Sequence, residues 1–332
     1  MRALLFLACS MVISLSAFSQ KNKQNREGPK DKTSSDDGTY SIINENTHIN
    51  YFSIGADPID MQIGDNFYMG HSISMDALLF KNIFLHSEYN YHYAVADLGS
   101  GNRVDGESVY NPTNSNDFEF MAGYHFTRKV DGKVKIKVKQ TGHTTYIAKV
   151  DAQYEKYWGI QAGIAKGVKL VYGTGTYNAT DYYSNAPTTF QGEFSTYMDY
   201  TWFLIGGSLG KLVDVTGKFS NFGDKREQDL TRFYLDLMIP ISTSLDDIYW
   251  LSGYGGTNPV YNRYHIDNTV GKGKFGFRIG YTQDFYSKII SGGPELAFLP
   301  GIENPQGSMS GYNPYFRIKF QIGFNKIFDK SN

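Results

Sequence analysis

The sequence predicts an all-β fold, a transmembrane antiparallel up-and-down β-barrel of about ten strands, with eight to fourteen left open, and a periplasmic β-hairpin extension. Two observations lead to this prediction. The first residues have the pattern of a secretory signal peptide. Most of the remaining chain alternates apolar and polar residues over segments of about 9 to 15 residues, the length that a tilted membrane strand needs. Soluble strands usually end after about five or six residues.

Residues 1–19 are expected to be the signal peptide, and cleavage is expected before Gln20. The supporting features are, in order, the basic residue Arg2, the apolar run from Ala3 to Leu15, and the small residues Ala17 and Ser19. Residues 20–40 are polar, mixed in charge and free of aliphatic side chains, which predicts a disordered N-terminal tether. The barrel is then expected to occupy residues 41–332.

The amino-acid composition argues against several classes of protein function. The formal net charge is −1, which argues against nucleic acid as a partner. The single cysteine, Cys9, lies in the expected signal peptide, so the mature chain has no disulfide and no thiol chemistry. No residue pattern is specific for a catalytic site, a metal site or a cofactor; "GGSLGKL" at Gly206, for example, lacks the spacing of a phosphate-binding loop.

The first three expected strands cover residues 48–56, 66–80 and 82–97. The first has the weakest pattern, and we keep it because bacterial barrels normally have an even strand number with both termini in the periplasm. A short periplasmic turn at Lys81 and Asn82 joins the second and third strands. The acids after the first strand are expected to be solvated turn residues, with a calcium site as the less favoured alternative: Asp57, Asp60 and Asp65.

The next four strands are expected over residues 116–129, 155–172, 191–213 and 229–243. Each has one apolar face and one polar or glycine-rich face, as Phe118 and Phe120 alternate with Glu119. The last three strands follow at residues 272–285, 290–300 and 313–328, with a periplasmic turn at 286–289. Long extracellular loops are expected at residues 98–115, 176–190, 244–271 and 301–312.

One face of these strands collects ionisable side chains, and we expect this face to line the lumen. A barrel of eight to ten strands has an interior filled by side chains, and buried charges must be paired. The simplest interpretation is a network of ion pairs and hydrogen bonds; the less favoured alternatives are a narrow conduit and a catalytic lumen built on His86, His92, His125 and Glu119. The predicted members are Asp76, His86, Glu88, His92, Glu119, His125, Arg232, Asp236, Arg278, Glu295, Arg317 and Lys319.

The stretch "KVKIKVKQ" continues the fourth strand beyond the membrane, on the periplasmic side. We predict a hairpin at about residues 130–154 that prolongs the barrel wall and turns at Gln140 to His143, with its lysines facing inward or downward. Four lysines on the lipid face would cost roughly 2 to 4 kcal/mol each at mid-bilayer, which excludes that position. They are either a solvated face or a contact for a partner: Lys133, Lys135, Lys137 and Lys139.

The expected loop at residues 244–271 is rich in aromatic residues, which suit contact surfaces because few torsions are fixed on binding. Its candidate contact residues are Tyr249, Trp250, Tyr254, Tyr261 and Tyr264.

The chain resembles the outer-membrane β-barrel proteins of Bacteroidota, a group of largely unassigned function. The resemblance lies in "SAFSQ" at the cleavage region, the basic alternating hairpin, "GGPELAFLPG" from Gly292, and "NPYFRIKFQIGFNKIF" from Asn313. The resemblance extends over nearly all of the mature chain and lies in the general sequence pattern, not in one exact motif. It implies the fold and a place in the cell outer membrane as a multi-pass barrel with both termini periplasmic, without implying a reaction.

Three functions remain open at this stage. The leading hypothesis is a structural or interaction barrel, as an accessory subunit of a surface, secretion or membrane-assembly complex. Its partners would be outer-membrane lipids and a periplasmic or surface protein. The first alternative is a small solute channel or porin. The second is an outer-membrane lipid or lipopolysaccharide hydrolase, which we disfavour because the outward residue His71 has no nucleophile or orienting acid on its face.

Overall fold

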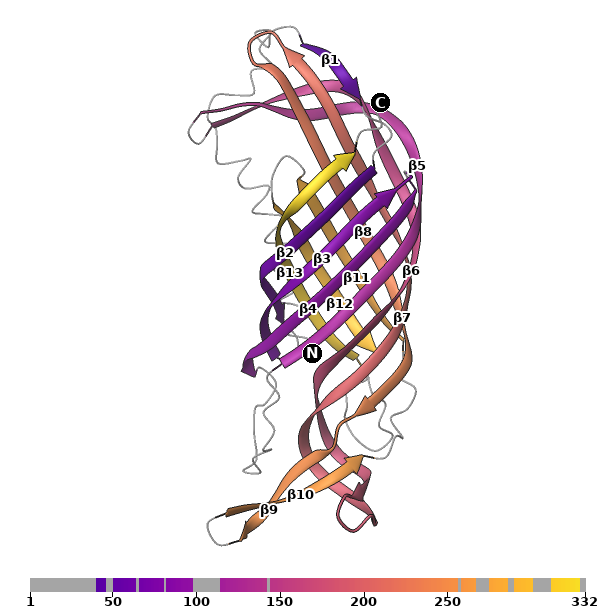
Figure 1. Cartoon of the computed structure of the whole chain (residues 1–332), viewed down its shortest axis with the longest axis vertical. Helices are drawn as coiled ribbons and strands as arrows, with labels where there is room; N and C mark the ends of the chain where they lie inside the picture. The colour runs from indigo at the N-terminus through magenta and orange to yellow at the C-terminus, as the bar shows by residue number, and fades with distance from the viewer. Residues whose placement is uncertain are drawn as a thin grey trace.

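A computed structural model describes residues 40–45, 50–63, 66–80, 82–97, 114–141, 144–255, 258–266, 275–285, 290–300 and 312–328. Within these ranges the fold is built from β-strands (Figure 1). No helix that is long and apolar enough to cross a membrane occurs in the described part of the chain. The expected signal peptide and tether lie outside the described residues, as does the expected turn at 286–289.

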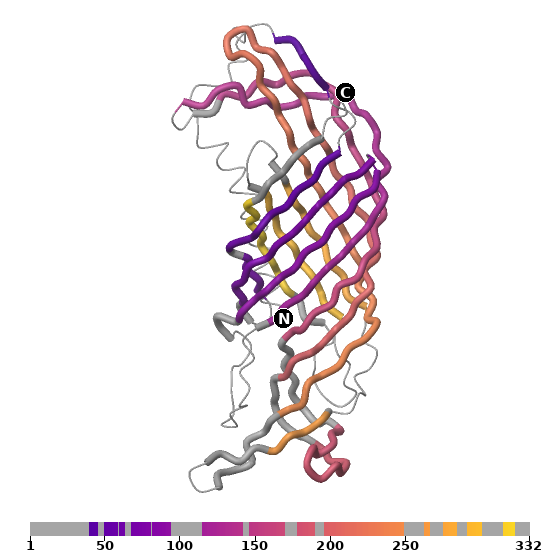
Figure 2. The backbone as a smooth tube through the Cα atoms, in the orientation of Figure 1, coloured from indigo at the N-terminus to yellow at the C-terminus, as the bar shows by residue number. Residues whose placement is uncertain are grey.

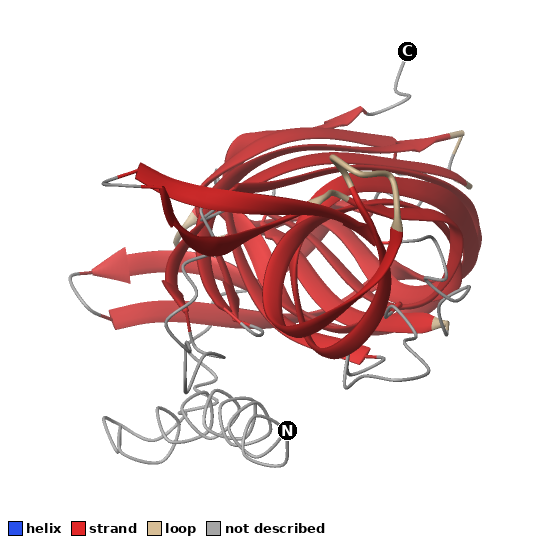
Figure 3. Cartoon of the chain, turned by 90° about the horizontal axis from the view of Figure 1, so that it is seen from below, coloured by secondary structure: helices blue, strands red, loops and turns tan. Residues whose placement is uncertain are grey.

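Ten strands close into a ring in which every neighbouring pair is antiparallel. They are, in ring order, β2 (Asn50–Ile63), β3 (Asn66–Leu79), β4 (Ile83–Asp97), β5 (Asn114–Thr141), β6 (Thr144–Asp181), β7 (Pro187–Phe219), β8 (Gly223–Leu245), β11 (Gly276–Phe285), β12 (Ile290–Pro300) and β13 (Tyr312–Phe328). The last strand pairs with the first, β13 with β2, so the ring has no free edge. The tilted strands are visible in Figure 2, and Figure 3 shows the strands of the barrel from below. The predicted ten-stranded up-and-down barrel is confirmed.

The ring has an apolar outer wall and a polar interior. Large apolar side chains that alternate along the strands are exposed on the outside, for example Phe120, Ile160 and Leu235 at 44%, 58% and 52%. The residues between them face inward and include buried charges such as Glu119 and Asp236. Soluble proteins rarely expose an apolar surface that continues over so many neighbouring strands. This inside-out arrangement follows directly from the period-two pattern of the sequence.

Strand β2 runs seven residues beyond the predicted end at Ala56. Its register with β3 shifts between Asp57 and Asp60, so two residues of β2 stand opposite one residue of β3. Pro58 lies in this bulge, a place where proline is tolerated because it has no N–H to donate to the ladder. The prediction that Asp57 and Asp60 are solvated turn acids is therefore wrong. Both carboxylates are buried, and Asp65 lies outside the described residues.

Beyond one end of the ring, two hairpins continue from the barrel strands and pack face to face. We call this part of the molecule the two-hairpin extension. It comprises residues 127–154 of β5 and β6, residues 213–229 of β7 and β8, and β1 (Tyr40–Glu45). The pairing of β6 with β7 ends at Glu155 and Leu212, and β1 takes the freed edge of β7. Side chains of β1 also reach β6, because the amides of Asp151 and Gln153 donate to the Tyr40 hydroxyl and the Glu45 carboxylate at 3.3 and 3.0 Å.

The two hairpins pack against each other through an apolar core. It contains Val134, Ile136, Val138, Val150, Ala152, Val213, Val215 and Phe219. These residues continue the strand faces that carry the exposed apolar wall of the barrel, so the same parity that is outward in the ring is buried in the extension. The expected continuation of the barrel wall is therefore corrected: the hairpin leaves the ring and folds as its own layer.

The opposite end of the barrel is also longer than expected. Strands β6 and β7 stay paired as far as Thr180 and Pro187, so most of the predicted loop at 176–190 is strand. The predicted loop at 244–271 contains two strands, β9 (Ile248–Gly255) and β10 (Asn258–Ile266), which pair with each other. Strand β10 also pairs with the end of β6. The predicted loops at 98–115 and 301–312 lie almost entirely outside the described residues.

Candidate functional site

The candidate site is the interior of the ring, where the structure places all twelve predicted network residues on inward strand positions. Asp76, His86 and Lys319 are partly buried and the other members are buried. Eleven of these residues line or border a common polar centre, and His125 lies apart from it.

The first half of the network is centred on Arg278 of β11. Its guanidinium donates two hydrogen bonds of 2.5 Å to Glu119 of β5 and one of 2.9 Å to Asp236 of β8. Glu295 of β12 lies 3.9 Å away and accepts hydrogen bonds from the hydroxyls of Tyr234 and Tyr315. Strands from opposite sides of the ring are thus joined through one cation, which satisfies the carboxylates inside the barrel.

The second half is centred on Arg317 of β13. It donates to Asp60 of β2 at 2.8 Å and to Glu88 of β4 at 2.8 Å, and Lys319 donates to Glu88 at 2.5 Å. The Nε2 atom of His92 lies 2.9 Å from Asp60. Asp60, which the sequence pattern misplaced, is therefore a central carboxylate of the network.

Other polar residues that the sequence analysis missed complete the network. Arg317 also donates to Asn90, Asn90 donates to Asp117 at 2.7 Å, and Gln161 donates to Asp236 at 2.6 Å. The inward parity of each strand was the signal that would have found them, because they alternate with the exposed wall residues.

His86 and Asp76 form a third contact near the hairpin end of the lumen. The Nδ1 atom of His86 lies 2.8 Å from Asp76, and its Nε2 atom lies 3.5 Å from Glu88 and within 3.9 Å of Glu119. The imidazole is thereby connected to both halves of the network.

Arg232 and His125 have different surroundings. Arg232 donates to Gln161 at 2.7 Å and lies over the Phe84 ring at 4.0 Å, and it has no carboxylate within 4 Å in the described part of the chain. The imidazole of His125 is stacked between Phe84 and Tyr157, with centroids 5.2 and 4.2 Å away. It belongs to an aromatic layer and not to the ion-pair network.

Two cavities of about 50 Å³ remain between these side chains. Each is large enough for a few water molecules. Glu119 and Arg278 line both cavities and form part of the partition between them. The contacts of Arg317 with Glu88 and of Tyr315 with Glu295 complete it. The cavity nearer the hairpins is lined by Lys319 and Arg232, and the other by Tyr200 and Trp202.

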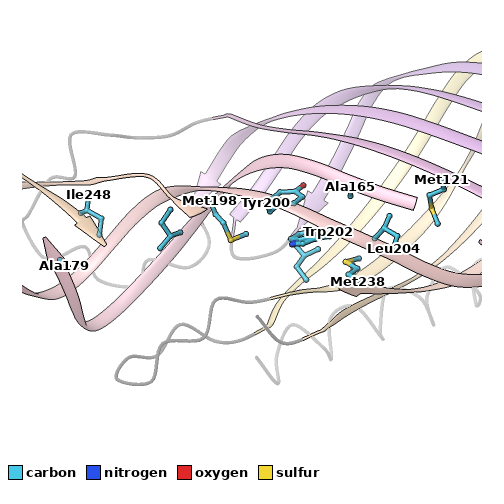
Figure 4. Close-up of a cluster of buried hydrophobic side chains, with 12 residues drawn as sticks. Met121, Ala165, Ala179, Met198, Tyr200, Trp202, Leu204, Met238 and Ile248 are labelled. Carbon is cyan, nitrogen blue, oxygen red and sulfur yellow. The ribbon is translucent and has the colours of Figure 1, made fainter. Parts of the chain in front are cut away.

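Apolar side chains fill the lumen on either side of the charged centre. At the hairpin end the inward cluster is Tyr51, Leu78, Phe84, Tyr157, Leu212 and Leu230, and each member is less than 5% exposed. Toward the other end a larger cluster lines β5 to β8, where Met198, Tyr200, Trp202, Leu204 and Met238 point inward (Figure 4). The stacked rings of Tyr200 and Trp202 lie 3.9 Å apart.

The hairpin lysines lie outside this site. Lys133, Lys135, Lys137 and Lys139 are all exposed, on the face of β5 opposite its buried valines. None forms an ion pair with a carboxylate in the described residues, although Asp151 is the cross-strand neighbour of Lys133. Lys135 stands directly opposite Lys149. These lysines continue the strand face that lines the lumen in the ring, and beyond the ring this face is exposed.

Of the five candidate contact residues at 244–271, only Tyr264 has a side chain within the described part. Tyr249, Trp250 and Tyr254 belong to β9, and Tyr261 belongs to β10, but their side chains lie outside the described part. Tyr264 is half-buried and packs against the apolar cluster of the lumen. Its position is that of a packing residue of the barrel end.

Comparisons with known proteins leave the family open. No family model matches the chain, and no curated protein matches it. Among solved structures, a mutant of TodX, a monoaromatic hydrocarbon channel, is 9% identical, with a TM-score of 0.22 and coverage of 85% of this chain and 91% of that one. A mutant of the Rh. blastica porin is 7% identical, with a TM-score of 0.16 and coverage of 86% and 100%.

Proposed function

We propose that this chain is a structural or interaction barrel that spans the outer membrane, with a lumen closed by its own side chains. The observation that carries the proposal is the continuous set of contacts from β13 and β11 to β4 and β5 across the lumen. A barrel of this size has little interior space, and the two cavities of about 50 Å³ are on the scale of water.

The outer wall supports the membrane location. Exposed aliphatic and aromatic residues alternate with buried polar ones on β3, β4, β5, β8 and β11, as expected for a wall in contact with lipid. We assign the two-hairpin extension to the periplasmic side, because the first and last residues of the ring, Asn50 and Phe328, pair at this end of the barrel and bacterial barrels normally have both termini in the periplasm. Its exposed lysines and the β9–β10 hairpin at the other end are the surfaces that we assign to protein partners in a surface, secretion or membrane-assembly complex.

Planar-bilayer recordings test the closed lumen. Purified protein should insert and pass no steady ohmic current, while a known porin measured under the same conditions provides the positive control. Steady single-channel steps from the unmodified protein would contradict the proposal.

A small solute channel is the second candidate, and one observation favours it. The two cavities follow each other along the lumen and are separated by side-chain contacts, among them that of Glu119 with Arg278, so a rearrangement of these contacts would join them. Steady conductance of the unmodified protein would favour this function. The hydrolase alternative gains no support, because the ring of outward His71 lies tilted against Tyr91, with centroids 5.3 Å apart, and no nucleophile or acid contact of its ring occurs among the described residues.

A further inference from the structure

The outer wall of β5, β6 and β7 changes character abruptly at the level where the two-hairpin extension begins. An apolar row crosses the sheet there, because each of its members is the cross-strand neighbour of the next: Phe126, Trp158, Leu209, Phe233 and Tyr281. All five are exposed, between 37% and 57%. The Phe126 and Trp158 rings are stacked at 4.1 Å. Such aromatic residues lie at the boundary between hydrocarbon and headgroups in membrane barrels.

Two residues further along three of these strands, the same face carries three cations. Arg128 follows Phe126 on β5, Lys156 precedes Trp158 on β6, and Lys211 follows Leu209 on β7. Side chains two residues apart share a face of a strand, so the cations point outward directly beside the apolar row. We call Arg128, Lys156 and Lys211 the cationic row.

The members of the cationic row are immediate cross-strand neighbours of one another, since Arg128 pairs with Lys156 and Lys156 pairs with Lys211. Like charges in directly opposite positions destabilise a sheet. None of the three forms an ion pair within 4 Å in the described part of the chain. An acid on the same face, Asp229, lies diagonal to Lys211 and accepts a hydrogen bond of 3.4 Å from Gln283.

Tyr154 brings two of the cations together. The ammonium groups of Lys156 and Lys211 lie 6.0 and 5.9 Å from the centroid of its ring. Both lysines are thus held at one place on the wall, on the extension side of Trp158. A concentration of positive charge next to an exposed apolar surface is complementary to an amphiphile with an anionic head.

We propose that the cationic row binds the phosphate groups of anionic phospholipids in the leaflet at the hairpin end of the barrel. This inference rests on the proposed membrane-spanning function. The acyl chains would cover the apolar row while the phosphate neutralises the cations, with the Arg128 guanidinium suited to bidentate contact and the two lysines acting as point charges. Each cation near a charged membrane surface contributes about 1 kcal/mol, and an anion between the three removes their mutual repulsion.

The extension offers a matched control. Lys133, Lys135 and Lys137 are also exposed and unpaired by carboxylates in the described residues. They lie on the opposite face of the same β5 strand, where no apolar row accompanies them. Replacing either trio by glutamine removes the same charge, and only the cationic row is predicted to select lipid.

Fluorescence of Trp158 reports the lipid beside it. A chain with Trp202→Phe and Trp250→Phe retains Trp158 as its single tryptophan, and is reconstituted into mixed vesicles of phosphatidylcholine and phosphatidylglycerol. In parallel samples one or the other lipid carries brominated chains, which quench nearby tryptophan. We expect about fivefold local enrichment of phosphatidylglycerol, the factor that a single membrane-surface cation provides. The enrichment should vanish in the triple variant Arg128→Gln, Lys156→Gln, Lys211→Gln. It should persist in the triple variant in which Lys133, Lys135 and Lys137 are replaced by glutamine.

The possible outcomes separate the two proposals. Equal quenching by both lipids would show a spanning barrel without lipid selection and would overturn the cationic row. Absence of quenching by either lipid would instead overturn the membrane-spanning function. If added inorganic phosphate abolishes the enrichment, the cationic row binds a dissolved anion in place of lipid, and the proposal is overturned. If the single-tryptophan chain does not fold, retention of phosphatidylglycerol by the otherwise unmodified variants in native mass spectrometry gives the same comparison.

Discussion

Glu119 on β5 and Arg278 on β11 meet across the lumen, where the guanidinium donates two hydrogen bonds of 2.5 Å to the carboxylate. The two residues are 159 positions apart in the sequence, and their strands are not neighbours in the ring. Each is largely buried. The pair therefore connects opposite walls of the barrel and helps to divide its remaining space.

Replacing Arg278 by methionine should destabilise the barrel strongly, because Glu119 would lose its guanidinium partner and Asp236 one of its donors. Breaking a buried ion pair by removing one partner costs about 3 to 5 kcal/mol. Denaturant unfolding of the refolded barrel in detergent micelles measures the change. The matched control is Arg263→Met, whose partner Asp247 lies outside the ring and whose side chain is 30% exposed; that change should cost about 1 kcal/mol or less. Equal losses for the two variants would contradict a structural role for the lumen network.

Replacing both Glu119 and Arg278 by alanine should join the two cavities without leaving a lone member of the pair. We expect this double variant to remain silent in planar bilayers, because the apolar clusters still fill the lumen on either side of the joined cavities. Heat-modifiable gel mobility, compared with the parent protein, verifies that the variant has folded. Current steps from a correctly folded double variant would show that this pair, and not the apolar clusters, closes the lumen.

Ile136→Ala should loosen the two-hairpin extension and leave the ring intact. Ile136 is fully buried between the two hairpins, and truncation of such a residue costs about 2 to 5 kcal/mol. The hairpin lysines should then become sites of tryptic cleavage in folded protein. Ile147→Ala is the control on the same hairpin, because Ile147 is 54% exposed. Identical digestion of both variants would refute the packing described for this layer.

Replacing Lys133, Lys135, Lys137 and Lys139 by glutamine should leave barrel assembly unchanged, since all four side chains are exposed. Removal of the Lys135–Lys149 repulsion should, if anything, stabilise the hairpin slightly. Site-specific cross-links formed from the hairpin in native membranes should be lost if a partner is held through this charge. Unchanged cross-links would remove the lysine face from the proposed contact surface.

The turn that follows β6 should respond to acid. Asp181 accepts hydrogen bonds from the Ser184 amide, the Ser184 hydroxyl and the Tyr183 amide, which lower the pKa of its carboxyl. Because the folded-state pKa is lowered, the stabilisation is present above the ordinary carboxyl pKa and is lost as the pH falls through the lowered value.

Hydrogen exchange of the Asn185 amide, which donates to the Asp181 carbonyl at 2.8 Å, reports the integrity of that turn. In Ser184→Ala the acid-induced loss of protection should begin at higher pH. Ser220→Ala, in the turn after β7, should leave this profile unmoved. A profile that is the same in Ser184→Ala and in the parent protein would contradict the assigned cause of the pKa shift.

The sequence predicted the walls of the barrel well because alternation is a local property. The parity of Phe118, Phe120 and Glu119 alone places each side chain inside or outside once the segment is a strand. The same logic failed at Asp57 and Asp60, where a bulge at Pro58 restarts the alternation and a proline looks like the end of a strand. A bulge depends on how two strands pair, which one segment does not reveal.

The partners within the network were beyond sequence reasoning for a related reason. Arg278 joins Glu119, and Arg317 joins Glu88, only because ring closure and strand stagger bring these positions to similar depths. The burial of Val134 and Ile136 could not be predicted for the same reason. Both residues lie on the strand face that is exposed in the ring, and in the extension this face is covered by the second hairpin. The pattern identified the face correctly, and tertiary packing decided what covers it.

The location of Arg317 and Asp60 has a consequence for how the barrel closes during biogenesis. They sit on β13 and β2, the last and first strands of the ring, so they come into contact only when the chain's two ends of the sheet meet. Before that moment Arg317 lacks its contacts with Asp60 and Glu88, and afterwards its guanidinium is paired with both. The seam is therefore joined by side-chain ion pairs as well as by backbone hydrogen bonds, and opening the wall between β13 and β2 would separate a buried ion pair.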